Sequence, residues 1–489
     1  MNDKLLNRLA GGLVVLASLE YFAVSLWAAA GHPLWMDEVL AVWTVRQPGF
    51  AAIWRTLEGG AEFSPPLYHW ALHLLFRLGA TSDLALRVPS ILAVYGVGLC
   101  AYALVRRRAS PLLAALALTA CLASGLGLYA VQIRQYAAVS LCFALALLAW
   151  DGAGERPSPR RAVLLGAALI AAVGLHFYAV LLAASVGLIE LLWMIRHRRI
   201  RWPFVAAVAA GGLSLALWLP IVLGVSRFNQ GDVHAAAYYA RPTVTGLAFG
   251  YVDGLAGHQA VALSPLVVLA WAGLFALALK LKAGPRAEPG PRDDIDLVIG
   301  VCGLIPLLVF VFALVVTHTF NSRYVVASAV GLAVLIALSV KALPSSPLIA
   351  AVAAALLTAG MASPLRTAGM MAEEGKALAL VAAAPGREPI FTANGLRYLE
   401  LRENLPPKIA ARVVYVLDPL GYVSPDPTNL HQVQRWLAMD PKLAAIAAAA
   451  LPRGALVYSD DSAVDFLAER VLAAKPVAAD GAARLARLD

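Results

Sequence analysis

The sequence predicts a polytopic α-helical membrane protein of about eleven transmembrane helices, followed by a small C-terminal α/β domain outside the membrane. Of its 489 residues, 61% are hydrophobic and 14% are charged, and the mean hydropathy is +0.74. A soluble domain is nearer one quarter charged. Apolar segments of about 17–22 residues, long enough to cross a hydrocarbon core of about 30 Å, recur up to residue 362. Beyond residue 363 the apolar runs shorten to the length of strands.

Several of the predicted spans have this length, and the others are apolar segments that are slightly shorter. The spans lie at roughly Leu9–Ala30, Val88–Val105, Pro111–Tyr129, Tyr136–Trp150, Val163–Leu175 extending to Tyr178, Val180–Ile195, Phe204–Val222, Val261–Leu281, Leu297–Val316, Tyr324–Val340 and Pro347–Met361.

The topology follows from lysine and arginine, which concentrate in alternate loops such as 106–108 and 196–201. Because cytoplasmic loops are rich in these residues, we expect a cytoplasmic N-terminus. Residues 31–87, 224–260 and everything after residue 362 then face outward. If the short segment Pro66–Leu78 crossed the membrane, every later loop would be inverted, so it is predicted to lie in the outer interface. The net charge of +9 is explained by these loops, and no nucleic-acid partner is expected.

Residues 363–489 are predicted to form an α/β domain separate from the membrane domain of residues 1–362. Segments beginning at Pro389, Arg412 and Ala455 have the pattern of buried strands. Each precedes a helical pattern, at Leu396–Asn404, Thr428–Leu437 and Ser462–Leu472. Alternating strands and helices favour a small parallel sheet.

The first outer loop contains an adjacent acidic pair, Asp37 and Glu38, a few residues after the first span. Apolar neighbours close to the membrane surface can raise the pKa of a carboxylate, which suits a general base. The alternative is that the pair lies in the first turn of a helix, where acidic residues interact favourably with the helix dipole. The pattern alone leaves both interpretations open.

Five short motifs give the chain a family resemblance. Trp35-Met-Asp-Glu-Val, Ser64-Pro-Pro-Leu-Tyr, Leu86-Arg-Val-Pro-Ser, Gln132-Ile-Arg-Gln-Tyr and Asn321-Ser-Arg-Tyr follow one another at matching topological positions. In this order the motifs resemble the GT-C membrane glycosyltransferases. The branch they resemble contains protein O-mannosyltransferases, lipid A aminoarabinose transferases and rhizobial galacturonosyltransferases. The likeness covers about residues 10–340.

The resemblance implies an enzyme that moves a sugar from a polyprenyl-phosphate donor to a hydroxyl group of a lipid, glycan or protein acceptor, with inversion at C1. Asp37 matches the catalytic acidic position and would accept the proton of the acceptor hydroxyl. Glu38 would orient the acceptor or assist. A glycosidase needs a second carboxylic acid to protonate its leaving group, whereas a lipid phosphate leaves as an anion and needs only a cationic clamp.

The predicted clamp for the donor phosphate is Arg134, Arg323 and the following Tyr324. Arginine binds phosphate oxygens in pairs and stabilises charge as the bond breaks. Each arginine stands at the outer end of a predicted span with an aromatic residue close behind it, Tyr136 and Tyr324 respectively. The alternative role is that of interfacial anchors. Arg87 is expected instead to hold the first loop to the second span.

Glu62, Tyr136 and His318 are further candidates for substrate binding. No metal or other cofactor is expected. His69 and His73, four residues apart, are the weak candidate for a divalent metal site, but they lack the intervening glutamate of zinc proteases. Aminoarabinose transferases carry Glu-Lys before Pro-Pro, where this chain has Phe63 and Ser64. This departure argues against aminoarabinose as the donor sugar.

Two other functions are alternatives to sugar transfer. One is a transporter or flippase of lipid-linked sugars, which would predict inverted repeats and polar residues at the membrane midplane. The other is a non-catalytic protein that binds the carrier lipid. High alanine, leucine and arginine content suggests a GC-rich bacterium, so the expected location is the inner membrane, with the site and the C-terminal domain on the periplasmic side.

Overall fold

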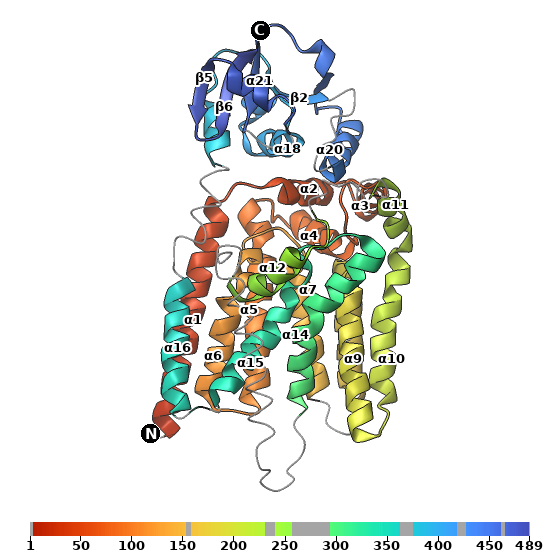
Figure 1. Cartoon of the computed structure of the whole chain (residues 1–489), viewed down its shortest axis with the longest axis vertical. Coiled ribbons are helices and arrows are strands. Elements are labelled where there is room, and N and C mark those ends of the chain that lie inside the picture. Colours follow the sequence, from red (N-terminus) through yellow and green to blue (C-terminus); the bar gives the residue numbers. More distant parts are fainter. Residues whose placement is uncertain are drawn as a thin grey trace.

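In a computed structural model, a bundle of long helices carries a layer of short helices at one end, with the C-terminal domain beyond that layer (Figure 1). We call this the domain-side end and the opposite one the far end. The structure describes residues 3–152, 158–229, 240–256, 294–341, 343, 345–361, 375–417, 427–460 and 465–488.

The bundle helices are rich in apolar residues on every side, as a lipid environment requires. Five of them are long and apolar enough to cross a membrane by themselves or with the helical turns that continue them. The bundle helices in the described part of the chain are α1 (Asp3–Gly31), α5 (Asp83–Arg106), α6 (Pro111–Leu122), α7 (Tyr136–Asp151), α8 (Pro159–Leu175), α9 (Ala179–His197), α10 (Trp202–Leu213), α11 (Leu219–Asn229), α14 (Ile295–Phe312), α15 (Ala329–Lys341) and α16 (Ser346–Met361). The five long ones correspond to α1, α5, α9, α10 with α11, and α14.

Large apolar side chains face outward along this bundle, among them Leu19, Val163 and Leu213, which are 65%, 71% and 74% exposed. A soluble protein does not present so continuous an apolar surface to water. The chain is therefore a polytopic membrane protein. Every predicted span that falls on described residues is helical, and the span predicted at Val261–Leu281 lies outside them.

Several spans are irregular at the domain-side end. A 3₁₀ turn, η1 (Gly125–Tyr129), follows α6, and two more, η5 (Ser322–Tyr324) and η6 (Val326–Ser328), precede α15. Helices α10 and α11 are joined by η2 (Ser214–Trp218), and α14 continues into a π-helical turn, η4 (Ala313–Thr317). The Asn321 side chain accepts a hydrogen bond from the Arg323 N–H, so local side-chain bonding sets the turn that carries Arg323.

The layer of short helices contains α2 (Met36–Val45), α3 (Phe50–Glu58) and α4 (Leu67–Arg77). At 11 residues α4 is too short to span a bilayer, and it lies beneath α2 (Figure 1). A short helix is therefore present where the sequence predicts one at Pro66–Leu78. A further helix, α12 (Val244–Ala256), falls in the second predicted outer loop, where no helix was expected.

The C-terminal domain is built on a six-stranded sheet in the order β3-β2-β1-β4-β6-β5. Its strands are β1 (Ile390–Thr392), β2 (Val413–Leu417), β3 (Ala445–Ala447), β4 (Ala455–Ser459), β5 (Pro476–Asp480) and β6 (Ala483–Leu488). Its helical segments are α18 (Gly395–Asn404), α19 (Pro407–Ala410), α20 (Pro427–Met439), η7 (Ala448–Ala450) and α21 (Ala468–Ala473).

The three predicted strands correspond to β1, β2 and β4, which pair in parallel. The prediction of an entirely parallel sheet is wrong, because β6 pairs antiparallel with both β4 and β5. A short turn joins β5 to β6, and such a hairpin forces antiparallel pairing.

Candidate active site

Helix α2 carries the acidic pair and begins directly after Trp35. Successive residues of an α-helix point about 100° apart, so Asp37 and Glu38 face different surroundings. The Glu38 side chain is fully buried, whereas that of Asp37 is 15% exposed. The helix-start interpretation therefore fits Glu38, whose Oε2 accepts the Trp35 N–H, while the role of Asp37 as a base stays a prediction.

Glu38 is bound by Arg87, which is itself fully buried. The guanidinium donates from Nε and Nη2 to the two carboxylate oxygens over 2.9 and 2.7 Å. Arg87 Nη1 donates to the carbonyl oxygens of Ala29 and His32, each over 2.7 Å. Its Nη2 also donates to the carbonyl oxygen of Pro33 over 3.2 Å. Arg87 thus joins the end of α1, the start of α2 and α5, which is the holding role expected from the sequence.

The same network decides how Glu38 can act. Its Oε1 also accepts the backbone N–H of Ile133 over 2.7 Å. A buried carboxylate that is fully hydrogen-bonded stabilises the structure around it. This environment favours a structural role for Glu38 and leaves no free carboxylate oxygen for the acceptor contact suggested by the sequence.

Asp37 faces two arginines that are far from it in the sequence. Arg323 Nη1 lies 2.9 Å from Asp37 Oδ2, and Arg134 Nη2 lies 3.4 Å from the same oxygen. Arg134 also donates to the main-chain oxygen of Asp37 over 3.1 Å. The structure therefore brings together the carboxylate and the two guanidinium groups that the motifs singled out, at the domain-side end of the bundle.

Glu62 lies on the other side of Arg134. Its Oε1 accepts Arg134 Nη1 over 2.9 Å, and its Oε2 lies 2.6 Å from His69 Nε2 on α4. Burial acts to raise the pKa of Glu62, but His69 and Arg134 outweigh it, so this pKa is lowered. The pKa of Arg134 is raised, because Asp37, Tyr136 and Glu62 outweigh its own burial.

The contact between Glu62 and His69 was not predicted from the sequence, which offered His69 either as a weak metal candidate or as part of ordinary interfacial packing. Its spacing of seven residues from Glu62 gave a weak signal, because a loop with two prolines separates them. His73 Nδ1 lies 2.8 Å from the Val45 main-chain oxygen. Among the described residues no group of three or more His, Cys, Asp or Glu side chains could hold a metal ion.

Aromatic rings line the arginines. The guanidinium carbons of Arg134 and Arg323 lie 5.7 and 5.9 Å from the ring centre of Tyr136, and Arg323 lies 5.8 Å from that of Tyr324. Tyr324 stacks on Tyr178 with ring centres 4.3 Å apart. These contacts hold both arginines by cation–π attraction and leave their hydrogen-bonding edges for anions.

His176 lies among these aromatic rings, with its ring centre 5.4 Å from those of Tyr136 and Tyr324. His318 begins the loop after η4 in a left-handed conformation, with φ of 53°. Its part in substrate binding stays a prediction.

Several buried polar atoms without a hydrogen-bond partner belong to residues close in sequence to the cluster. They include Arg134 Nε, Ser64 Oγ, Gln135 Oε1 and Trp35 Nε1. Each belongs to Arg134 or to a residue within two positions of Asp37, Glu62 or Arg134. Buried polar groups are normally paired, so these atoms are candidates for contact with a ligand.

Two kinds of comparison relate this chain to known proteins. Residues 64–223 match the model of the dolichyl-phosphate-mannose-protein mannosyltransferase family, a region that contains Arg87, Arg134 and Tyr136 but not Asp37 or Arg323. Among curated proteins, none matches the sequence of the chain.

Two crystal structures of ArnT from Cupriavidus metallidurans resemble the whole chain. The apo form has 14% sequence identity and a TM-score of 0.62, and the match covers 98% of each chain. The form bound to undecaprenyl phosphate has 15% identity and a TM-score of 0.59, covering 97% of this chain and 98% of ArnT. The resemblance predicted from the sequence is thereby confirmed at the level of the fold: this chain has the architecture of the GT-C membrane glycosyltransferases.

Proposed function

We propose that this protein is an inverting glycosyltransferase that moves a sugar from a polyprenyl-phosphate donor to a hydroxyl acceptor at the membrane surface. The observation that carries the proposal is the position of Asp37, whose carboxylate lies between the guanidinium groups of Arg134 and Arg323. A base and an anion clamp in direct contact are the two elements that transfer from a lipid phosphate requires.

The arginine pair supplies the site for the donor phosphate. Each guanidinium can offer two parallel N–H groups to phosphate oxygens. In the present structure both bind Asp37, and a phosphate can replace that carboxylate as their partner. The ArnT structure with undecaprenyl phosphate and the dolichyl-phosphate-mannose family match support a polyprenyl-phosphate donor.

Asp37 then acts as the general base. The acceptor hydroxyl transfers its proton to the Asp37 carboxylate while its oxygen forms a bond to C1 of the sugar. The bond between C1 and the phosphate oxygen breaks, and its electron pair stays on the polyprenyl phosphate. Both arginines stabilise the charge that develops there. A single displacement inverts the configuration at C1.

Glu62 and His69 keep Arg134 in place for this reaction. Glu62 is 3% exposed and His69 is fully buried. This buried pair holds the guanidinium group of Arg134 in a fixed position. Glu62 is therefore a support for Arg134, whereas direct contact with substrate is reserved for Asp37, the two arginines, Tyr136 and Tyr324.

We further propose that the reaction takes place on the periplasmic face of a bacterial inner membrane, with the C-terminal domain on that side. The charge bias of the loops supports this orientation. Lipid, glycan and protein hydroxyl groups are the acceptor classes that fit a base at the membrane surface.

The experiment is sugar transfer by purified protein in detergent. The donors are undecaprenyl phosphate linked to mannose, galacturonic acid or aminoarabinose, and the acceptor is a bacterial membrane lipid and glycolipid extract. We expect at least one donor to release undecaprenyl phosphate as the sugar appears on the acceptor, and Asp37→Asn to abolish both. If Asp37→Asn transfers sugar as fast as the parent protein, Asp37 is not the general base. If the donor crosses the membrane of vesicles and no sugar is transferred, the protein is a flippase.

A further inference from the structure

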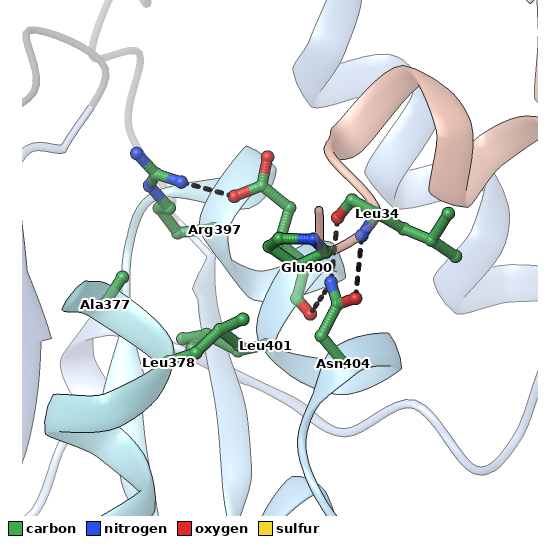
Figure 2. Close-up of a pocket in the computed structure, with 8 residues that line it drawn as sticks. Leu34, Ala377, Leu378, Arg397, Glu400, Leu401 and Asn404 are labelled. Atoms are coloured by element: carbon green, nitrogen blue, oxygen red, sulfur yellow. Dashed lines mark hydrogen bonds and ion pairs between the residues drawn. The ribbon is translucent and has the colours of Figure 1, made fainter. Parts of the chain in front are cut away.

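Helix α18 of the C-terminal domain contacts the start of the helix that carries Asp37. The Asn404 side chain makes two hydrogen bonds to the backbone of Leu34: Oδ1 accepts its N–H over 2.9 Å, and Nδ2 donates to its carbonyl over 2.8 Å. Glu400 Oε1 accepts the N–H of Met36, the first residue of α2, over 2.9 Å. Figure 2 shows Asn404 reaching Leu34 and Glu400 beside it.

These contacts complete a cap that α2 makes only in part within its own segment. The first N–H groups of a helix have no partner inside the helix, and a carboxylate at that end is favoured by the helix dipole. Glu38 Oε2 accepts a hydrogen bond from the Trp35 N–H over a long 3.4 Å. The Met36 N–H donates instead to Glu400. Arg397 holds the other oxygen of Glu400 over 2.6 Å.

The other end of α2 is held by the same helix. Glu403 accepts hydrogen bonds from Trp43 Nε1 over 2.6 Å and from Arg46 Nη1 over 2.7 Å. Trp436 of α20 packs edge-on against Trp43 with ring centres 5.3 Å apart. The domain thus holds α2 at both of its ends.

A small cavity lies where α18 meets the start of α2. The cavity that Pro33, Arg397 and Glu400 help to line has a volume of about 10 Å³, which is room for about one water molecule. Leu34 and Met36 are 2% and 4% exposed. Such close packing transmits the position of α18 to α2.

We propose that α18 is a positioning element of the active site, in which Glu400 and Asn404 fix the start of α2 and so hold Asp37 against Arg134 and Arg323. This inference rests on the proposed function, in which Asp37 is the base. Asp37 is the residue directly after Met36, so a shift of the first turn of α2 moves the carboxylate. A misplacement of about 1 Å can cost about 100-fold in rate.

The test compares variants of the full chain. In the double variant Glu400→Ala with Asn404→Ala, both contacts to the start of α2 are lost. We expect kcat with the active undecaprenyl-phosphate-linked sugar to fall about 10- to 100-fold, while KM for that donor changes less than about threefold. Glu400→Gln keeps an oxygen acceptor for Met36 N–H and should restore most of kcat relative to Glu400→Ala. The control is Glu388→Ala, since Glu388 pairs with Arg487 away from α2.

A second measurement, hydrogen exchange of the backbone, reads the contact without any substrate. We expect faster exchange in peptides covering residues 34–45 of the double variant, and unchanged exchange in α5. Unchanged exchange or unchanged kcat in the double variant overturns the positioning role. So does a loss that Glu400→Gln fails to restore and that comes with a lower unfolding temperature.

Asp37→Asn separates the two proposals. If Asp37→Asn is inactive and the double variant is fully active, the proposed function stands and the positioning role fails. If Asp37→Asn transfers sugar as well as the parent protein, the proposed function fails, and the positioning role fails with it.

Discussion

The two ends of the helix bundle both contain arginine paired with a carboxylate beside aromatic rings, yet the two arrangements differ. At the far end, where α9 turns into α10, Arg201 Nε donates to Glu190 Oε1 over 3.0 Å, and Arg201 Nη2 pairs with Oε2. Trp150 Nε1 also donates to Glu190, over 2.8 Å. The carbon of the guanidinium lies 3.7 Å from the ring centre of Trp193.

The far-end pair is closed, whereas the domain-side cluster is open. Glu190 and Arg201 are 2% and 3% exposed, against 15% and 18% for Asp37 and Arg323. At the domain-side end two arginines share one oxygen of Asp37, and Arg134 Nε is buried without a partner. A closed pair contributes to structure, while an open cluster can exchange one of its anions for another.

The sharpest test of this contrast removes the charge of each carboxylate in turn. Asp37→Asn should lower the transfer rate by about 10²- to 10⁴-fold, which is the usual contribution of a general base. Glu190→Gln should leave the rate within about threefold, because Glu190 is at the opposite end of the bundle. The measurement is the rate of sugar transfer from undecaprenyl-phosphate-linked donors by each variant. A large loss of this rate in Glu190→Gln would contradict the contrast between the two ends.

Next in size is a loss of stability at the far end. Arg201→Ala leaves the carboxylate of Glu190 buried without its cation, which should cost about 3–5 kcal/mol. Thermal unfolding in detergent measures this, with Arg160→Ala at an exposed position as the control. Equal unfolding temperatures for the two variants would mean that the far-end pair is not structural.

A smaller effect is expected on carrier-lipid binding. Arg323→Ala removes one charge-assisted contact to phosphate and should weaken undecaprenyl phosphate binding by about 10- to 100-fold. The unfolding temperature should hardly change, since Arg323 is partly exposed. Arg77→Ala, on the exposed face of α4, is the control for general charge attraction. Binding that is equally weak in both variants would speak against a specific clamp.

The smallest predicted effect is a pH dependence of stability. The pKa of Glu62 is lowered in the folded protein, so its ionised form stabilises the fold above its ordinary pKa of 4.5. This contribution is lost as the pH falls through the lowered value. Glu62→Gln should therefore unfold about 1 kcal/mol more easily at pH 7, with a difference that vanishes in acid. If the two proteins still differ in stability at low pH, the effect does not come from the charge of Glu62.

The meeting of Asp37, Arg134 and Arg323 could be predicted because each lies at the outer end of a predicted span. Topology alone brings such positions to one membrane face. The motifs that contain these residues then narrowed the choice among several polar residues on that face.

Other features were beyond sequence reasoning for physical reasons. The sequence did not reveal which residue of the acidic pair turns inward, because that depends on the rotation of α2 about its axis. The bond between Glu62 and His69 depends on a loop whose path two prolines set. Strands β5 and β6 are short and rich in alanine and arginine, so their pattern is too weak to predict a hairpin.

The capping of α2 by α18 has a consequence for biosynthesis. The amide groups of Leu34 and Met36 find their acceptors 370 and 364 residues later in the chain. When the ribosome has finished the last bundle helix, the start of α2 still lacks these partners. The start of α2 therefore acquires its cap only after Glu400 and Asn404 have been synthesised and their domain has folded, which delays the complete geometry around Asp37 until well after the bundle helices exist.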